Sequence, residues 1–214
     1  MLETFIDRKD AGIKLAAALS DYITKDSIVM ALPRGGVVLG YKIAKKFKLP
    51  LDVFISRKIR HPFNPEYAIG AITETGHILI NEQSISSISI SGDYLVKEIS
   101  EEKKLIADKI NIFREGKPLP NLNSKDIILV DDGIATGYSI TAAIESLRQL
   151  KVANIILAVP VASIDIIESL TKIVDKIFVL LSPPYLSAVG EFYSDFSQVT
   201  DDEVIEILSK SKRP

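Results

Sequence analysis

The sequence predicts an α/β fold built on a doubly wound, mainly parallel sheet. Three observations lead to this expectation: short apolar segments alternate with amphipathic helical segments, several apolar segments have no polar face, and acidic or small residues follow them. Alternation of this kind favours parallel strands joined by right-handed helical crossovers. No repeat or linker divides the 214 residues, so we expect a single domain over residues 1–214.

The first half of the chain carries both helical and strand patterns. Apolar residues three and four positions apart predict helices, and short β-branched runs predict strands. A Thr-Gly pair between two apolar runs predicts a hairpin turn. The expected elements are a helix over 13–23, a strand over 28–32, a helix over 37–47, a strand over 53–55, and a hairpin of 68–72 with 78–80.

The second half begins with a long charged stretch whose apolar residues keep a helical spacing. A Pro- and Asn-containing break then precedes a regular alternation of strands and helices. The expected elements are a helix over 93–114, a break over 116–123, strands over 127–130, 155–161 and 177–181, and helices over 139–150, 163–174 and 202–208.

Composition limits the classes of function. Hydrophobic residues make up 47% of the chain and charged residues 25%, as in ordinary globular proteins. The net charge of −2 gives no basic field for nucleic acid or for an acidic membrane. The absence of cysteine excludes disulfides, thiolate catalysis and cysteine-bound metals. With no signal pattern at the N-terminus and no membrane-length apolar run, we expect a cytoplasmic protein.

The most informative segment runs from Ile127 to Ser139. A buried strand ends in two acids, Asp131 and Asp132, at the edge where open α/β sheets bind ligands. A loop of small and hydroxyl residues then opens a helix, and such loops present backbone amides to phosphate groups. Acids beside a phosphate site must bind something else, such as sugar hydroxyls or a metal shell. The segment therefore suggests a sugar phosphate held at both ends.

This segment resembles the phosphoribosyl-pyrophosphate (PRPP) signature of the type I phosphoribosyltransferases. The resemblance implies a five-stranded parallel core sheet, and it assigns the ribose hydroxyls to Asp131 and Asp132. It assigns the 5-phosphate to the loop, with Thr136 and Ser139 as side-chain donors. The loop residues are Gly133, Ile134, Ala135, Thr136, Gly137, Tyr138 and Ser139.

Two further segments are similar to the pyrophosphate-binding parts of the family. Arg34, Gly35 and Gly36 follow the first strand, where glycines let the backbone approach a ligand and an arginine can bind a pyrophosphate. The resemblance also implies a cis peptide near Pro33-Arg34. Arg57 and Lys58 follow the second strand as candidate pyrophosphate cations, with Arg60 as a weaker one. A solvated basic turn is the alternative.

The resemblance places a lid and helical insertion at about 60–120 and a hood over the acceptor base at about 183–200. The stretch from His61 to Gly76 is expected to begin as a stiff, irregular loop because of its prolines, and Asn64, Glu66 and Tyr67 have no assigned role. His61 and His77 form no metal-binding spacing. The hood candidates for stacking a base are Phe192, Tyr193 and Phe196, which otherwise pack on the domain surface.

One position departs from the family pattern. Enzymes for 6-oxopurines carry an acid in the signature loop where this chain has Ala135, so the chain is not expected to use hypoxanthine or guanine. The N-terminal segment, from Phe5 through Asp7, Arg8 and Asp10 to Gly12, resembles an uncharacterised branch of the family.

The resemblance therefore implies an enzyme that transfers phosphoribosyl from PRPP to a nitrogen nucleophile of the nucleobase class, releasing pyrophosphate. Asp131, Asp132, Arg34 and Lys58 are its expected catalytic residues, and Mg²⁺ its expected cofactor, held by the acids through water or ribose hydroxyls. We expect neither nucleic acid nor a membrane as a partner, and we expect the protein to form a homodimer. The alternative is a sensor that binds PRPP without catalysis.

Overall fold

A computed structural model describes residues 4–81 and 90–211. The helices are α1 (Arg8–Ala18), α2 (Gly35–Phe47), α4 (Gly92–Arg114), α5 (Tyr138–Gln149), α6 (Ile164–Leu170) and α7 (Asp201–Ser211), with 3₁₀ turns η1 (Ser20–Tyr22) and η2 (Val189–Phe192). The strands are β1 (Ser27–Ala31), β2 (Leu51–Val53), β3 (Ser56–His61), β4 (Asn64–Thr73), β5 (Ile78–Ile80), β6 (Asp126–Val130), β7 (Asn154–Val161) and β8 (Lys176–Leu181).

The predicted five-stranded parallel sheet is confirmed. Its strand order is β2-β1-β6-β7-β8, and every neighbouring pair is parallel. Ala31 at the end of β1 pairs with Val130 at the end of β6. The loops that follow these two strands therefore leave the sheet side by side, at its carboxyl edge.

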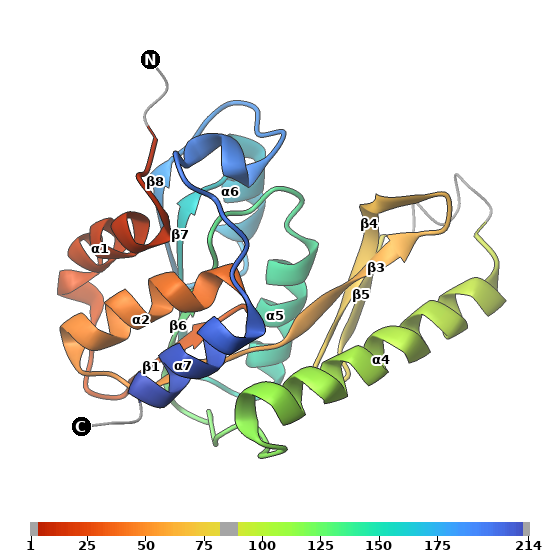
Figure 1. Ribbon diagram of the computed structural model, residues 1–214, viewed down its shortest axis with the longest axis horizontal. Coiled ribbons are helices and arrows are strands. Elements are labelled where there is room, and N and C mark those ends of the chain that lie inside the picture. The colour runs from red at the N-terminus through yellow and green to blue at the C-terminus, as the bar shows by residue number, and fades with distance from the viewer. Residues whose placement is uncertain (1–3, 82–89, 212–214) are drawn as a thin grey trace.

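Helices cover both faces of this sheet, as expected for a doubly wound fold (Figure 1). Alternate residues of one strand pack into opposite layers: Val29 and Ile128 lie in the layer with α1, α2 and α7, whereas Met30 and Leu129 lie in the layer with α5 and α6. All four side chains are fully buried. No helix of the described residues is long and apolar enough to cross a membrane.

A second unit, which we call the arm, consists of β3, β4, β5 and α4. Its three strands form an antiparallel sheet in the order β3-β4-β5, so the predicted hairpin of 68–72 with 78–80 is confirmed. Helix α4 lies along this sheet, and the arm extends to one side of the core (Figure 1). Buried hydroxyls join it to the core, since Thr73 Oγ1 lies 2.7 Å from Ser146 Oγ of α5.

The prediction of an irregular loop from His61 onward is wrong. Residues 64–73 form β4, and only Pro62 and Phe63 separate it from β3. The imidazole Nδ1 of His61 accepts hydrogen bonds from the amides of Phe63 (3.0 Å) and Asn64 (3.1 Å), which closes the turn.

Arg57, Lys58 and Arg60 follow the second strand, β2, as predicted, but all three lie within β3, a strand that was not predicted from the sequence. Side chains of a strand alternate between its faces, so Arg57 and Lys58 point in opposite directions. Two helices differ from their predicted ranges: the first begins earlier, at Arg8, and ends at Ala18 shortly before η1, and α6 is shorter than predicted and ends at Leu170.

Candidate functional site

A cavity of about 400 Å³ lies at the carboxyl edge of the parallel sheet, where the loops after β1 and β6 meet. It brings together most of the residues selected from the sequence. Its lining residues are Arg8, Pro33, Arg34, Gly35, Lys58, Asp131, Asp132, Gly133, Ile134, Ala135, Thr136, Gly137, Ser139, Ile140, Val189, Phe196, Gln198 and Val199.

The two acids lie in the cavity at the end of β6. The amide of Asp132 donates to Asp131 Oδ1 at 2.8 Å, and the Tyr193 hydroxyl donates to the Asp132 carbonyl at 2.7 Å. Burial of its carboxyl group and the charge of neighbouring Asp132 raise the pKa of Asp131 well above its usual value. Burial, followed by the Asp132 charge, likewise raises the pKa of Tyr193. The charged form of Asp131 is therefore disfavoured in the ligand-free protein, and a ligand that brings hydroxyl donors or cations would stabilise it.

The loop after the acids forms the wall that the sequence predicts as a phosphate site. Gly133 (φ 154°) and Gly137 (φ 80°) take backbone angles that favour glycine. Gly137 is the N-cap of α5 and supplies no side-chain acceptor, which leaves the first helical amides available to a ligand. Thr136 and Ser139 line the cavity.

Two loop residues lie differently from the expectation. The Ile134 amide donates to the Val161 carbonyl at 2.9 Å, so this amide is not free for phosphate. Tyr138 does not line the cavity, and its hydroxyl accepts a hydrogen bond from Asn81 Nδ2 at 2.6 Å. These two contacts anchor the loop to β7 and to the segment after β5.

The loop between β1 and α2 forms the opposite wall. The peptide bond between Pro33 and Arg34 is cis, as the resemblance implies. A Cβ atom on Gly35 would lie 1.8 Å from Asp132 Oδ2, and one on Gly36 would lie 2.7 Å from the Val130 carbonyl oxygen. Glycine is therefore required at both positions for the two loops to approach each other. Gly36 does not itself line the cavity.

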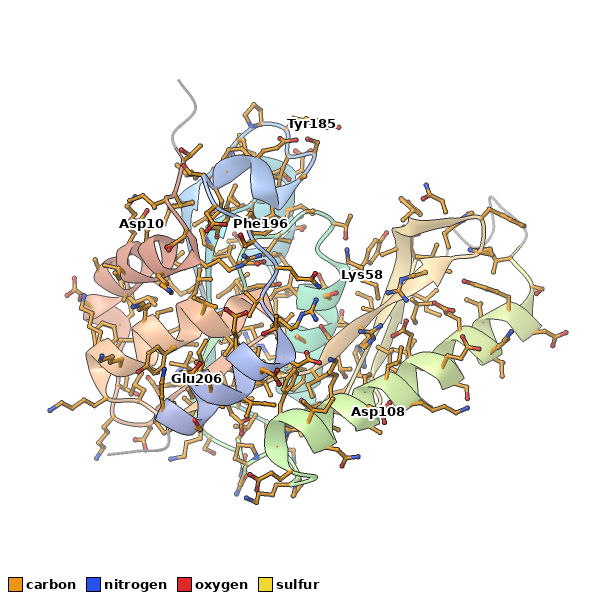
Figure 2. All side chains as sticks on the ribbon, in the orientation of Figure 1. Asp10, Lys58, Asp108, Tyr185, Phe196 and Glu206 are labelled. Carbon is orange, nitrogen blue, oxygen red and sulfur yellow. The ribbon has the colours of Figure 1, made fainter. Side chains whose placement is uncertain are left out.

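The basic side chains divide between two cavities. Lys58 lines the acid-bearing cavity and lies between the arm and the core (Figure 2). Arg57 instead forms an ion pair with buried Glu102 of α4 and lines a neighbouring cavity of about 330 Å³. Arg34 lines both cavities, with Nη1 3.8 Å from Asp201 Oδ1. Arg60 also pairs with Glu102, at 2.7 Å.

Among the three hood candidates, Phe196 is the one that lines the cavity. Phe192 and Tyr193 are buried, with 5% and 7% of their surface exposed, so they pack into the core. The Phe196 ring lies 4.9 Å from the Tyr193 ring between centroids. Figure 2 shows Phe196 on the C-terminal segment that crosses above the sheet.

Sequence reasoning missed the position of Arg8. Its Nε donates to Asp132 Oδ2 at 2.7 Å, and its guanidinium carbon lies 3.7 Å from the centre of the Phe196 ring. The sequence held a signal, since Arg8 belongs to the N-terminal segment that resembles a branch of the family. That segment gave no indication of which distant residue Arg8 would meet.

Comparisons with known proteins agree with this geometry. The family model described as "Phosphoribosyl transferase domain" matches residues 5–183. Two curated proteins of Mycobacterium tuberculosis, both named "Putative phosphoribosyl transferase", are 36% identical over 214 residues, which are 99% of this chain and 48% of theirs. The chain thus spans about half the length of these curated relatives.

Solved structures show the same similarity. The crystal structure of TT1426 from Thermus thermophilus is 35% identical, with a TM-score of 0.80 and coverage of 97% of this chain and 98% of that one. A purine phosphoribosyltransferase from Pyrococcus horikoshii shares the fold at 14% identity, with a TM-score of 0.50 and coverage of 90% and 92%. With its parallel sheet, its acid pair and its family match over residues 5–183, this chain belongs to the phosphoribosyl transferase domain family.

Proposed function

We propose that this protein transfers the 5-phosphoribosyl group from PRPP to a nitrogen nucleophile of the nucleobase class and releases pyrophosphate. The observation that carries the proposal is the shared cavity. Two acids, the amides at the start of α5, and the cations Arg34 and Lys58 all face one space of about 400 Å³. A ligand with a phosphate at one end, hydroxyls in the middle and a pyrophosphate at the other end matches this arrangement of charges.

Each wall has a distinct task in this proposal. The loop from Gly133 to Ser139 binds the 5-phosphate, and Asp131 and Asp132 bind the ribose hydroxyls. The acids also stabilise positive charge that develops on the ribose ring as the bond to pyrophosphate breaks. Arg34, Lys58 and the backbone at Gly35 receive the negative charge of the leaving pyrophosphate. The nitrogen nucleophile attacks the anomeric carbon from the face opposite the leaving group.

Magnesium is part of the proposal as a cofactor of the donor. Among the described residues, no group of three or more His, Cys, Asp or Glu side chains could hold a metal ion by itself. Magnesium commonly binds through one or two carboxylates together with substrate phosphates, and Asp131 and Asp132 fit this manner of binding. When bound with the donor, it would neutralise pyrophosphate charge.

A PRPP sensor without catalysis is the second candidate. The observation that favours it is Ala135, which leaves this position of the loop without a general base. The same walls would bind PRPP in either case. A role in nucleotide metabolism and a homodimer complete the proposal and rest on the family resemblance, and light scattering tests the dimer. A cytoplasmic location also belongs to the proposal.

The experiment is release of pyrophosphate from PRPP and magnesium across a panel of nucleobases and small amines. Release that depends on one acceptor supports the enzyme, whereas PRPP binding in calorimetry without release under any acceptor supports the sensor. Wild-type protein that binds no PRPP contradicts both.

The matched variant is Asp131→Asn with Asp132→Asn, which we expect to abolish pyrophosphate release. Its unfolding temperature should stay nearly unchanged, because the loss of a buried charge at position 131 offsets the loss of the Arg8 ion pair at position 132. Retained release by a folded double variant would reject the role of the acids.

A further inference from the structure

We propose that Arg8 is a positioning residue that holds the Asp132 carboxylate in place for the donor's ribose and ties the C-terminal segment to that acid. The inference rests on the proposed function, because it assigns a task to Asp132 in binding PRPP. It adds the N-terminal segment, which is remote in sequence from the signature, to the binding site.

The local sequence fixes where Arg8 emerges. Asp7 is the N-cap of α1, and its side chain accepts from the Asp10 amide at 2.8 Å, so Arg8 is the first helical residue. The Phe5 amide donates to the Phe192 carbonyl at 2.9 Å, and the Ser194 amide donates to the Phe5 carbonyl at 2.8 Å. This pairing places the start of α1 beside the segment that carries Phe196.

Glycine within α1 brings the helix close to the core. A Cβ atom on Gly12 would lie 2.9 Å from the Leu39 Cα atom of α2, so only glycine allows this helix contact. Ala11 on the same helix is fully buried. The N-terminal segment that sequence analysis could not explain thus has one consistent effect: it aims Arg8 at the cavity.

The Arg8 guanidinium is held at three points. Its Nε donates to Asp132 Oδ2 at 2.7 Å, its Nη1 donates to the Ser197 carbonyl at 2.8 Å, and its carbon atom lies 3.7 Å from the Phe196 ring centre. The side chains of Arg8 and Asp132 are 11% and 17% exposed. A charge-assisted bond at this distance between two mostly buried side chains restricts the rotation of both.

The positive charge of Arg8 also reduces the repulsion between the two acids and an anionic ligand. Two adjacent acids disfavour an anionic donor, and the charge of Asp132 adds to burial in raising the pKa of Asp131. Within the part of the chain that the structure describes, Arg8 is the one cation in ion-pair contact with either acid. It therefore offsets one carboxylate charge beside the cavity.

The opposing model is that Arg8 occupies the place of the ribose and must leave before PRPP binds. The two models predict opposite signs for an Arg8 variant. A positioning residue strengthens PRPP binding, so its removal weakens binding, whereas a competing residue weakens binding, so its removal strengthens it.

The test is calorimetry of PRPP with magnesium, and of inorganic pyrophosphate with magnesium as a ligand that lacks ribose. The variants are Arg8→Gln, Arg8→Lys and the control Lys14→Gln. Lys14 lies on the same helix, pairs with Asp10 at 2.9 Å and has its Nζ 5.2 Å from the Phe5 ring centre, but it does not line the cavity. It thus matches Arg8 in helix, ion pair and ring contact.

We expect Arg8→Gln to weaken PRPP binding roughly tenfold, the effect of losing one charged hydrogen bond. Arg8→Lys should restore part of the loss by keeping the charge, and Lys14→Gln should bind as the wild type does. Pyrophosphate affinity should fall less than PRPP affinity in Arg8→Gln, because pyrophosphate has no ribose hydroxyls for Asp132 to bind, and it should not change in Lys14→Gln. Thermal unfolding without ligand is recorded for each protein, so that a loss through misfolding is identified.

Arg8→Gln that binds PRPP as tightly as, or more tightly than, the wild type overturns the proposal. An equal loss of PRPP and pyrophosphate affinity also overturns it, since that result indicates general damage to the site. If thermal unfolding shows that Arg8→Gln is misfolded, Arg8→Lys serves as the folded variant. If wild-type protein binds no PRPP, the proposed function fails first. If the wild type binds PRPP and Arg8→Gln does not differ, only the inference about Arg8 fails.

Discussion

At the scale of single residues, the site contains ionisable groups whose burial is energetically unfavourable. Asp131 is a carboxyl group whose raised pKa reflects burial beside a second acid. Between the ordinary value of 3.8 and its raised value, the folded state binds more protons than the unfolded state. The contribution of Asp131 to stability is therefore greatest at low pH and is lost as pH rises through its folded-state pKa.

Asp131→Asn should consequently stabilise the ligand-free protein at high pH. We expect the unfolding temperature to rise by about 2–4 °C at pH 8, corresponding to about 1 kcal/mol, and by less at pH 4. Differential scanning calorimetry at both pH values measures the effect. Exposed Asp108 on α4, which does not line the cavity, is the control, and its Asn variant should change the unfolding temperature little. A larger rise at pH 4 than at pH 8 would show that the sign is wrong.

Gly35 shows a second constraint at the residue scale. Ala at this position would place Cβ 1.8 Å from Asp132 Oδ2, and the carboxylate that must yield is the one that Arg8 holds. We expect Gly35→Ala to weaken PRPP binding by about tenfold or more in calorimetry, with a small effect on folding. Gly92→Ala is the matched control, because a Cβ there meets nothing within 4 Å. Equal affinities in the two variants would count against contact between PRPP and Asp132.

At the scale of elements, one buried acid fastens α4 to the sheet of the arm. Glu102 is 2% exposed and forms ion pairs with Arg57 and Arg60 of β3. The Tyr94 hydroxyl of α4 donates to the Arg60 carbonyl at 2.8 Å, which adds a second connection. Because Glu102 is buried and pairs with two arginines at once, we expect its loss to weaken the arm.

Glu102→Gln should lower the free energy of unfolding by about 1–3 kcal/mol, because two arginines lose their shared counter-charge. Urea denaturation followed by circular dichroism measures the change. The control is Glu101→Gln on the same helix, where an exposed acid lies 3.9 Å from Lys97 and should contribute less than about 0.5 kcal/mol. A similar effect of both variants would mean that Glu102 does not fasten the arm.

At the scale of the whole molecule, the cavity is assembled from two units. The core supplies the acids and the phosphate loop, and the arm supplies Lys58 from β3. Because the neighbouring side chain of Arg57 faces α4, one strand contributes both to binding and to the stability of the arm.

Variants of these two neighbours should therefore have different effects. Lys58→Ala should raise the PRPP dissociation constant several-fold, about 3–10 times, and leave the unfolding temperature unchanged. Arg57→Ala should lower the unfolding temperature and change PRPP affinity less. Titration calorimetry and thermal unfolding on both proteins give the comparison. An unchanged PRPP affinity of Lys58→Ala would show that this lysine does not bind PRPP. A greater loss of PRPP affinity in Arg57→Ala would show that Arg57 binds PRPP instead.

The sequence by itself determined the central sheet and most of its helices. Runs such as 127–130 are short, apolar on both faces and rich in β-branched residues, which favours a strand buried in a parallel sheet, and the structure has this strand. The acids and glycines after that strand were likewise predictable, because ligand contact at a strand end requires those residue types in that order.

Only the tertiary structure decided how residues far apart in the chain meet. Arg8 lies 124 positions from Asp132, and no periodicity or local preference encodes that contact. The division of Arg57 from Lys58 and the folding of 64–73 into a strand also depended on partners, namely Glu102 and the antiparallel neighbours of β4. Local sequence specifies strands, turns and caps through short-range energies, whereas ion pairs and strand partners are chosen by the packing of the whole chain.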